Sequence, residues 1–335
     1  MTSKQEYKID IIANVPFILI HVGCLLIFWT GFSWAALITC FVLWFVRMFG
    51  ITAGYHRYFS HRTYKTSRWF QFILAVLGNS SAQLDPLWWA AHHRHHHRHT
   101  DTTHDIHSPI ISGFWWSHMG WIMCPKYFTT NEQNIRDFAR YPELKYLNRF
   151  PIVIPIILAI AVTALGRLLQ HYIPQSGTTG LQMLAWGFFF STLLLYHSTF
   201  TINSLAHVFG TRRFDTVDSS RNNLLLALIT LGEGWHNNHH YYPASERQGF
   251  YWWEIDITHY ILKLLSELGL VWDLRTPPEK IYEKLDRLFP KSFISKIFSI
   301  GSQPLKRFNL FLRDRYANFA DQVKQMSREQ TQTKK

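Results

Sequence analysis

Four long apolar runs, separated by polar segments, dominate the pattern of hydrophobic and polar positions. They cover Ile12–Thr30, Trp34–Ala53, Phe150–Tyr172 and Gly180–Thr201. A helix needs about 20 predominantly apolar residues to cross a bilayer, and each run is close to that length. The sequence therefore predicts an all-α integral membrane protein with four transmembrane helices.

Short connections join these runs into two hairpins. Gly31-Phe32-Ser33 joins the first pair and His171–Thr179 joins the second. Neither link carries Lys or Arg, whereas the polar segments 54–149 and 202–275 and the remaining C-terminal residues are rich in both. Cytoplasmic loops of membrane proteins carry an excess of these residues. We therefore expect both termini, and a cap formed by the two polar segments, to face the cytoplasm.

Three further features refine this outline. Trp69–Gly78 is apolar but too short to span, so it is either an interfacial or re-entrant helix or a helix packed in the cap. Arg47 lies inside the second run, where a charge either marks a functional site or reaches the interface.

After Pro277-Pro278 the chain alternates basic and apolar residues. We therefore divide it into a domain over residues 1–275 and a basic tail over 276–335, either amphipathic surface helices or a solvated extension.

Composition narrows the functional classes. The chain of 335 residues is 47% hydrophobic and has three cysteines, with no CxxC pair, so it carries no disulfide framework or cysteine metal site. Its formal net charge is +12. No block of aromatic-interleaved basic residues indicates a nucleic-acid partner.

Ten residues in four boxes carry the candidate chemistry. The boxes contain His56 and His61; His93, His96 and His97; Asn203 and His207; and His236, His239 and His240. Each helical residue turns by about 100°, so both H-x-x-H-H boxes place three imidazoles on one face, and Asn203 lies one turn from His207. His56 and His61 would be about 140° apart on an ideal helix. We expect the helix to end or loosen between them.

The other histidines are assigned away from this set. On the same helical wheel, His92, His95 and His99 lie opposite the ligand face, and His104 and His107 follow the box. We interpret His21, His118, His171 and His259 as ordinary surface or core residues. A metal-storage tract over residues 92–107 would leave the other three boxes unexplained.

Neutral imidazoles suit iron, zinc or copper, and nine of them are too many for one ion. Two ions are the natural count, with no carboxylate among the ligand positions of the boxes. Such a pair of metals beside apolar helices favours oxygen chemistry on a lipid-like substrate. Asp101, Asp105, Glu233 and Asp256 are candidates for orienting the imidazoles, by proximity in sequence.

Over about residues 10–275 the chain resembles the membrane-bound stearoyl-CoA (acyl-CoA Δ9) desaturases in their bacterial form. The likeness is carried by residues 50–64, 88–97, 203–210 and 232–240, which contain the four boxes. The resemblance implies four spans in a bacterial cytoplasmic membrane under a cytosolic helical cap with two irons. It implies an oxidoreductase that uses O2 to introduce a cis double bond, at Δ9 of C16 and C18 saturated acyl chains.

The resemblance also implies roles for particular residues. One iron would take His56, His61, His97 and His240, with a water held by Asn203. The other would take His93, His96, His207, His236 and His239. The bend of an acyl tunnel would be lined by Gln83, Trp89 and Thr199.

Two departures concern the partners. Ala91-His92 stands where the animal enzymes have an Arg-Asp that contacts the CoA headgroup. The acyl carrier is therefore CoA, a phospholipid or acyl carrier protein. No His-Pro-Gly-Gly haem-binding segment occurs, so we expect a separate electron donor, a ferredoxin or cytochrome b5 with its reductase.

Two other functions compete with desaturation. A membrane di-iron hydroxylase of alkyl or lipid substrates uses similar boxes. A non-enzymatic metal transporter would place histidines along the spans, whereas here nearly all lie beyond the span ends.

Overall fold

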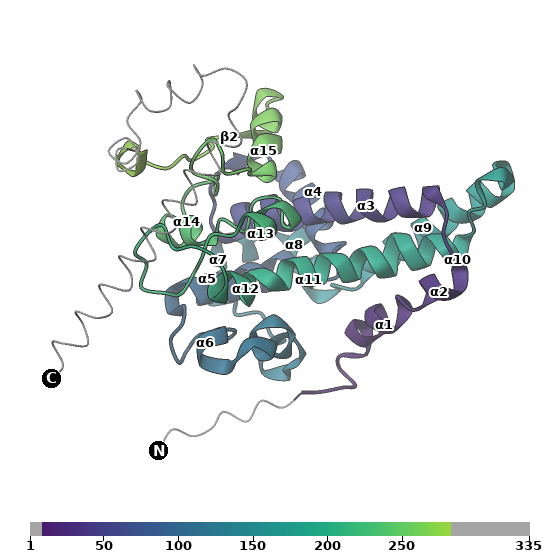
Figure 1. The fold of residues 1–335 in the computed structure, drawn as a ribbon, viewed down its shortest axis with the longest axis horizontal. Helices are drawn as coiled ribbons and strands as arrows, with labels where there is room; N and C mark the ends of the chain where they lie inside the picture. The colour runs from purple at the N-terminus through teal and green to yellow at the C-terminus, as the bar shows by residue number, and fades with distance from the viewer. Residues whose placement is uncertain (1–8, 283–335) are drawn as a thin grey trace, which may run out of the picture. The chain divides into compact units, whose positions relative to one another are not determined.

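The computed structural model describes residues 9–282, which are mostly helical (Figure 1). Residues up to Pro277 form one compact unit, and those from Pro278 onward belong to a second. Nearly all of the predicted tail, residues 276–335, lies outside the described residues. Within residues 9–282 a single strand pair is an addition to the predicted all-α fold: β1 (Lys65–Thr66) pairs antiparallel with β2 (Val271–Trp272), with Thr66 opposite Val271.

In the part of the chain that the structure describes, two helices are long and apolar enough to cross a membrane. The first is Trp34–Ser60, in which α3 (Trp34–Phe49) continues directly into the π-helical η1 (Gly50–Ser60). The second is α9 (Val153–Tyr172). The first contains the second predicted span, and α9 begins three residues inside the third, at Val153. Apolar side chains are exposed along α9, including Ile157 at 54% and Leu168 at 54%.

The fourth predicted span lies on a continuous helix, Gly180–Asn203. It consists of α10 (Gly180–Met183), the π-helical η7 (Leu184–Phe190) and α11 (Ser191–Asn203). The first predicted span is not one helix. It is divided into α1 (Val15–Gly23) and α2 (Leu26–Thr30) by a turn at Cys24, where hydrogen bonds from Leu25 N to Val22 O and from Ile27 N to Cys24 O tighten the backbone.

The remaining helices are short. They are α4 (Arg68–Asn79), α5 (Pro86–His99), α6 (Pro109–Ser112), η2 (Trp116–Gly120), η3 (Trp121–Met123), η4 (Pro125–Tyr127), η5 (Glu132–Asn134), α7 (Arg136–Ala139), α8 (Pro142–Arg149), η6 (Pro174–Ser176), α12 (Leu205–Val208), α13 (Leu224–Ile229), α14 (His236–Tyr241) and α15 (Ile257–Glu267).

Helix α4 contains the apolar segment that the sequence left between two interpretations. It packs closely along η1. A Cβ atom at Gly78 would lie 2.2 Å from Cε1 of Tyr55, so glycine is required for the approach. Phe70 and Leu74 of α4 are buried, whereas Trp69 is 57% exposed. The helix therefore packs against the box-bearing helix through one face and leaves a bulky apolar side chain on another.

Arg47 is internal and does not reach an interface. Its side chain is buried and donates to Ser191 Oγ at 2.6 Å and Thr192 Oγ1 at 2.7 Å, both on α11. It also donates to the carbonyl of Ser80 at 3.3 Å, just after α4. Because buried polar groups need partners, this set of bonds fixes α3, α4 and α11 together below the first box.

Candidate metal centre

The first histidine box lies at the end of η1, with His56 inside it and His61 directly after it. A π-helix forms i→i+5 hydrogen bonds, and His61 N donates to His56 O at 3.2 Å. The wider turn brings two residues five apart onto neighbouring positions, with ring centroids 4.9 Å apart. The prediction that this helix loosens or ends between His56 and His61 is confirmed: it loosens before His56 and ends at Ser60.

The second box lies on α5, whose start is well defined. Asp85 caps the helix by accepting from Leu87 N at 2.9 Å and Trp88 N at 3.1 Å, and Pro86 occupies the first turn. Both features favour helix initiation. The helix then carries His93, His96 and His97 toward the other boxes, as the wheel predicts.

The third box spans a helix break: Asn203 is the last residue of α11, and His207 lies on the short helix α12. The predicted turn from Asn203 to His207 is therefore interrupted at Ser204. The fourth box lies on the short helix α14. A hydrogen-bonded asparagine cluster positions α14: Asn222 Oδ1 accepts from the backbone of Asn237 at 3.0 Å and of Asn238 at 3.1 Å. Asn238 also donates to Gln248 O at 2.9 Å and to Glu254 Oε2 at 2.9 Å. The helix is therefore anchored from its buried side, although it is only six residues long.

All nine box histidines come together in two groups. The first contains His56, His61, His93, His97 and His239. The second contains His96, His207, His236 and His240. Within each group the candidate ligand atoms lie within 4.8 Å of one another. This grouping differs from the one that the resemblance implies, because His93 and His239 join the first group and His240 joins the second.

The Nε2 atoms of these rings converge at close range. In the first group, His239 Nε2 lies 3.1 Å from His56 Nε2 and 2.9 Å from His97 Nε2, and His61 lies 2.9 Å from His93. In the second group, His207 Nε2 lies 3.1 Å from His236 Nε2. Nitrogens bound to one ion at roughly 2.0–2.1 Å would be about 3 Å apart. The donor set therefore fits two metal ions.

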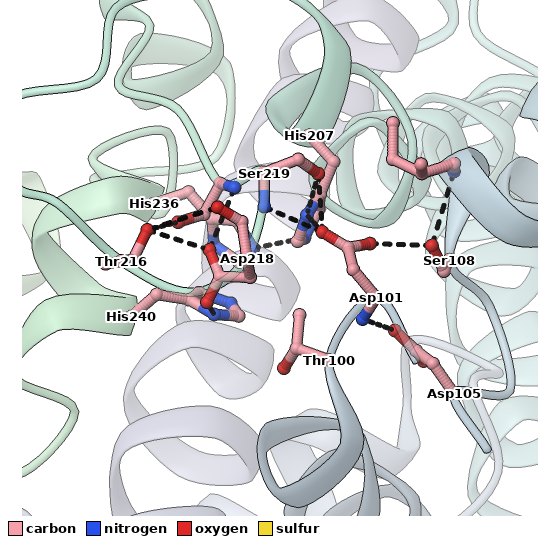
Figure 2. Close-up of polar contacts among 12 residues, drawn as sticks. Thr100, Asp101, Asp105, Ser108, His207, Thr216, Asp218, Ser219, His236 and His240 are labelled. Atoms are coloured by element: carbon pink, nitrogen blue, oxygen red, sulfur yellow. Dashed lines mark hydrogen bonds and ion pairs between the residues drawn. The ribbon is translucent and has the colours of Figure 1, made fainter. Parts of the chain in front are cut away.

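Carboxylates fix the opposite nitrogen of three of these rings. Glu233 pairs with His56 Nδ1, Asp105 accepts from His96 Nδ1 at 3.0 Å, and Asp218 accepts from His240 Nδ1 at 2.9 Å (Figure 2). An ionised carboxylate only accepts, so Nδ1 carries the proton in each ring. Nε2 is thereby left as a lone pair that can bind a metal.

A large apolar groove leads to the histidines. Its volume is about 930 Å³, and its lining includes Phe17 of α1, Ile156 of α9 and Phe188 of η7. At one end it reaches His93 and Asn203. A volume at the upper end of the usual range for small-molecule sites, with mostly apolar walls, suits a long hydrocarbon.

Comparisons with known proteins decide the family. A family model described as "Fatty acid desaturase" matches residues 32–274. The chain is 35% identical over 286 residues to an sn-1 stearoyl-lipid 9-desaturase of Anabaena variabilis, covering 84% of this chain and 99% of that protein. The chain belongs to the fatty acid desaturase family.

Other relatives agree on desaturation and differ in the acyl carrier. Identity is 36% to the Delta-9 acyl-lipid desaturase 1 of Arabidopsis thaliana, over 83% of this chain and 88% of the relative. It is 37% to an acyl-CoA C20 Delta5-desaturase of Anemone leveillei, over 78% of this chain and 80% of the relative. Both are similar proteins over most of their length.

The tunnel residues implied by the resemblance lie together in this desaturase. Gln83 Nε2 donates to Thr199 Oγ1 at 3.1 Å, and Trp89 stacks on His93 with ring centroids 4.9 Å apart. All three line the groove, where it meets the first histidine group. Asn203 lines the same place, and its carbonyl accepts from Ser117 Oγ at 2.6 Å. Their roles stay predictions.

The remaining histidines of the α5 region mostly point elsewhere. His92 Nδ1 donates to the carbonyl of Trp88 at 2.9 Å, and His95 Nε2 to that of His104 at 2.9 Å. His99 packs against His95, with centroids 4.6 Å apart. His107 is the exception: it stacks on His96 at 4.3 Å and forms a third group with His96 and Asp105.

Four carboxylates were named from the sequence as orienting candidates, and the structure separates them. Asp105 and Glu233 contact box histidines directly. Asp101 lies 3.6 Å from His207 Nδ1 and accepts from Ser219 N at 2.7 Å. Asp256 pairs with Arg57 and not with a box histidine. Sequence reasoning missed Asp218, because it lies 22 positions before His240 and nothing in the sequence indicates their contact.

Burial and mutual repulsion favour the neutral form of His93 and His97. The pKa of His93 and that of His97 lie well below the ordinary value, because burial disfavours the charged form and neighbouring histidines repel it. Burial alone would raise the pKa of Asp218, yet the hydrogen bond from His240 holds it below its usual range. The desaturase therefore presents neutral rings supported by ionised carboxylates, the states that metal binding needs.

Proposed function

We propose that this desaturase introduces a cis double bond at Δ9 of saturated C16 and C18 acyl chains, using O2 and two iron ions. The observation that carries the proposal is the convergence of nine imidazoles, in two groups, at the end of an apolar groove. Relatives whose names specify a 9-desaturase or Delta-9 activity support the position.

The chemical problem is the removal of two hydrogens from adjacent, unactivated methylenes. No side chain performs this, so a cofactor must. When bound, a pair of irons would supply the activation of O2. In the overall reaction the alkyl chain gives up two hydrogen atoms with their electrons, an external carrier gives two electrons, two protons come from water, and one O2 becomes two waters. We propose that His56, His61, His93, His97 and His239 hold one iron, and His96, His207, His236 and His240 the other.

The protein's own residues would position the chain and exclude water. Trp89 lies between the groove and the first group, 5.9 Å from His56 by ring centroids. The Gln83–Thr199 hydrogen bond ties the loop before α5 to α11 at the same place. Holding one methylene pair in a fixed position lowers the entropic part of the barrier. We propose that this trio sets which carbons face the metals.

We further propose four spans in the cytoplasmic membrane, with both termini and the histidines on the cytoplasmic side. The apolar exposure of α9, with Ile160 at 63%, supports lipid contact. A tag at Lys335 should be protected from external protease in intact cells, whereas external cleavage would invert the orientation.

The electron donor is proposed to be a separate ferredoxin or cytochrome b5 type carrier with its reductase.

The acyl carrier is proposed on different evidence. Ala91 is buried and His92 donates to a backbone carbonyl, so neither offers a free cation to a CoA headgroup. Relatives named for lipid-linked substrates favour a lipid carrier.

Expression in a host that lacks unsaturated fatty acids tests the proposal. We expect Δ9 monounsaturated C16 and C18 chains by gas chromatography, and none from a His240→Ala variant of equal abundance. Hydroxylated chains in place of unsaturated ones would favour the alternative hydroxylase. Folded, iron-loaded protein that makes neither product with a donor present would overturn the proposal.

A further inference from the structure

The groove that leads to the histidines lies between two helices that hardly touch. Both α1 and α9 pack against the helix Gly180–Asn203, but they make few contacts with each other. Side chains from both line the groove, among them Phe17 and Leu19 of α1 and Ile156 and Ala159 of α9. The groove is partly open along these two helices and is not a fully enclosed tunnel.

The floor of the groove is one stripe of the helix Gly180–Asn203. Leu184, Phe188, Tyr196, Thr199, Phe200 and Asn203 line it in order. From Leu184 to Asn203 the stripe extends on the order of 28 Å at the α-helical rise, close to the thickness of a bilayer's hydrocarbon core. It ends beside His93, so the floor forms a continuous apolar path from the depth of the predicted span to the metal groups.

The walls of the groove are apolar at their exposed edges. Leu19 is 55% exposed, Ile156 48% and Ile160 63%, and all three line the groove. A contiguous apolar opening of this kind would be unfavourable in water. It lies on the helices that are proposed to cross the membrane, where hydrocarbon covers it.

We infer that the acyl chain enters sideways from the bilayer, between α1 and α9, while it is still attached to a membrane glycerolipid. This inference rests on the proposed function and names its acyl carrier. An enclosed tunnel admits a chain only by its free end, after the chain has left the membrane. An open side lets one chain of a two-chain lipid bend into the groove while the headgroup and the second chain stay in the bilayer.

The solvation of the chain favours this path over one through water. The free energy of exposing an alkyl chain to water grows with each methylene. A chain that moves from lipid directly into an apolar groove is never exposed to water. The polar atoms at the inner end, Gln83 Nε2 with Thr199 Oγ1, are already paired with each other. Binding a hydrocarbon there therefore leaves this pair satisfied.

The test uses the full-length protein in nanodiscs that contain a phosphatidylglycerol with a diazirine in the middle of one acyl chain. After illumination, mass spectrometry locates the adducts. We expect adducts on groove residues such as Phe17, Ile156 and Phe188, reduced by excess distearoyl phosphatidylglycerol. Adducts confined to outward positions such as Ile157 would overturn the inference.

Matched variants separate the groove from the outer surface. Ile156→Trp narrows the groove, whereas Ile157→Trp places the same ring on the neighbouring, similarly exposed position that does not line it. We expect at least tenfold less adduct on Phe188 and tenfold slower desaturation of stearoyl lipid in Ile156→Trp, and little change in Ile157→Trp. Both variants must show wild-type thermal unfolding; Ile160→Trp serves if Ile156→Trp does not.

The outcomes distinguish this inference from the proposed function. Desaturation of the lipid with equal adducts and rates in both variants would overturn lateral entry and leave the function standing. Desaturation of stearoyl-CoA but not of stearoyl lipid in the same nanodiscs would overturn the lipid carrier. Desaturation of neither substrate, with donor and iron supplied, would overturn both proposals.

Discussion

The carboxylate of Asp218 accepts a hydrogen bond from Nδ1 of His240 at 2.9 Å, and both side chains are nearly inaccessible to solvent. Asp218 also accepts from Ser220 N at 2.9 Å and Thr216 Oγ1 at 3.1 Å, as Figure 2 shows for Thr216. The loop between α12 and α13 thus fixes the protonation of a residue on α14. His240 Nε2 is buried without a hydrogen-bond partner, as expected of an atom reserved for a metal.

Replacement of Asp218 by Asn should therefore weaken iron binding. An amide can donate to Nδ1 and favour the tautomer whose Nε2 carries the proton, which cannot bind a metal. Loss of such a supporting partner typically costs 10–100-fold in metal affinity or activity. Iron content and desaturation rate of the purified variant measure the effect. Asp215→Asn, an exposed position in the same loop, is the control and should behave as wild type.

Alanine substitutions on the two faces of α5 should differ in their effect on activity and iron content. His97→Ala removes a ring whose neighbour His239 lies 2.9 Å away, and should abolish activity and lower iron content, as should His240→Ala. His95 instead donates to the carbonyl of His104 at the surface, so His95→Ala should keep most activity. Metal analysis of the three purified proteins decides. Equal losses in all of them would contradict the assignment of faces.

The helical pattern could be predicted from the sequence because it depends on local periodicity. Apolar runs located α3, α9 and the helix Gly180–Asn203, and the spacing of the H-x-x-H-H boxes gave their shared faces. The loosened helix at His56 and His61 followed from a five-residue spacing that a regular α-helix cannot accommodate. The division of the first run at Cys24 was not predicted: Gly23 is a poor helix former, but a single glycine within an apolar run does not by itself end a helix.

Pairings between distant segments could not be predicted either. The contact of Asp218 with His240, and the distribution of nine rings between two groups, depend on how α5, α12 and α14 pack. Proximity in sequence correctly identified Asp105 and Glu233 as partners of box histidines. It was wrong for Asp256, which contacts no box histidine. Its partner is Arg57, whose guanidinium also binds Glu233. The sequence alone did not distinguish Glu233, which pairs with a box histidine, from Asp256, which pairs with the arginine beside Glu233.

Arg57 should be far more important for stability than Arg62, five positions later. The Arg57 guanidinium is buried and lies 3.0 Å from both Glu233 and Asp256. Arg57→Met would leave two buried carboxylates without their cation, a loss of about 3–5 kcal/mol. The Arg62 side chain is 61% exposed and forms one ion pair, with Asp137 at 3.3 Å, so Arg62→Met should cost less than about 1 kcal/mol. Thermal unfolding in detergent compares the two; similar midpoints would refute the difference.

The proposed electron donor should bind through charge. The chain has a formal net charge of +12, and acidic carriers are attracted to basic surfaces. Purified protein should be inactive with reduced nicotinamide alone and gain activity with a ferredoxin or cytochrome b5 and its reductase. Under donor-limited conditions the rate should fall as salt rises, because screening weakens steering. Turnover without any added carrier would exclude a separate donor.

The position of the double bond should depend on Trp89. Its ring stacks on His93 and lines the groove beside the Gln83–Thr199 hydrogen bond. Trp89→Ala would widen the groove where the chain meets the metal groups. Because Trp89 is only partly buried, the stability cost should be below the roughly 3–5 kcal/mol of a fully buried Trp. The ring would no longer hold one methylene pair in place, so activity should drop and products should include double bonds next to Δ9.

Mass spectrometry of dimethyl disulfide adducts locates these double bonds. Trp115→Ala, exposed and outside the groove, should keep the wild-type product. A folded, active Trp89→Ala enzyme with unchanged Δ9 purity would show that the position is set elsewhere.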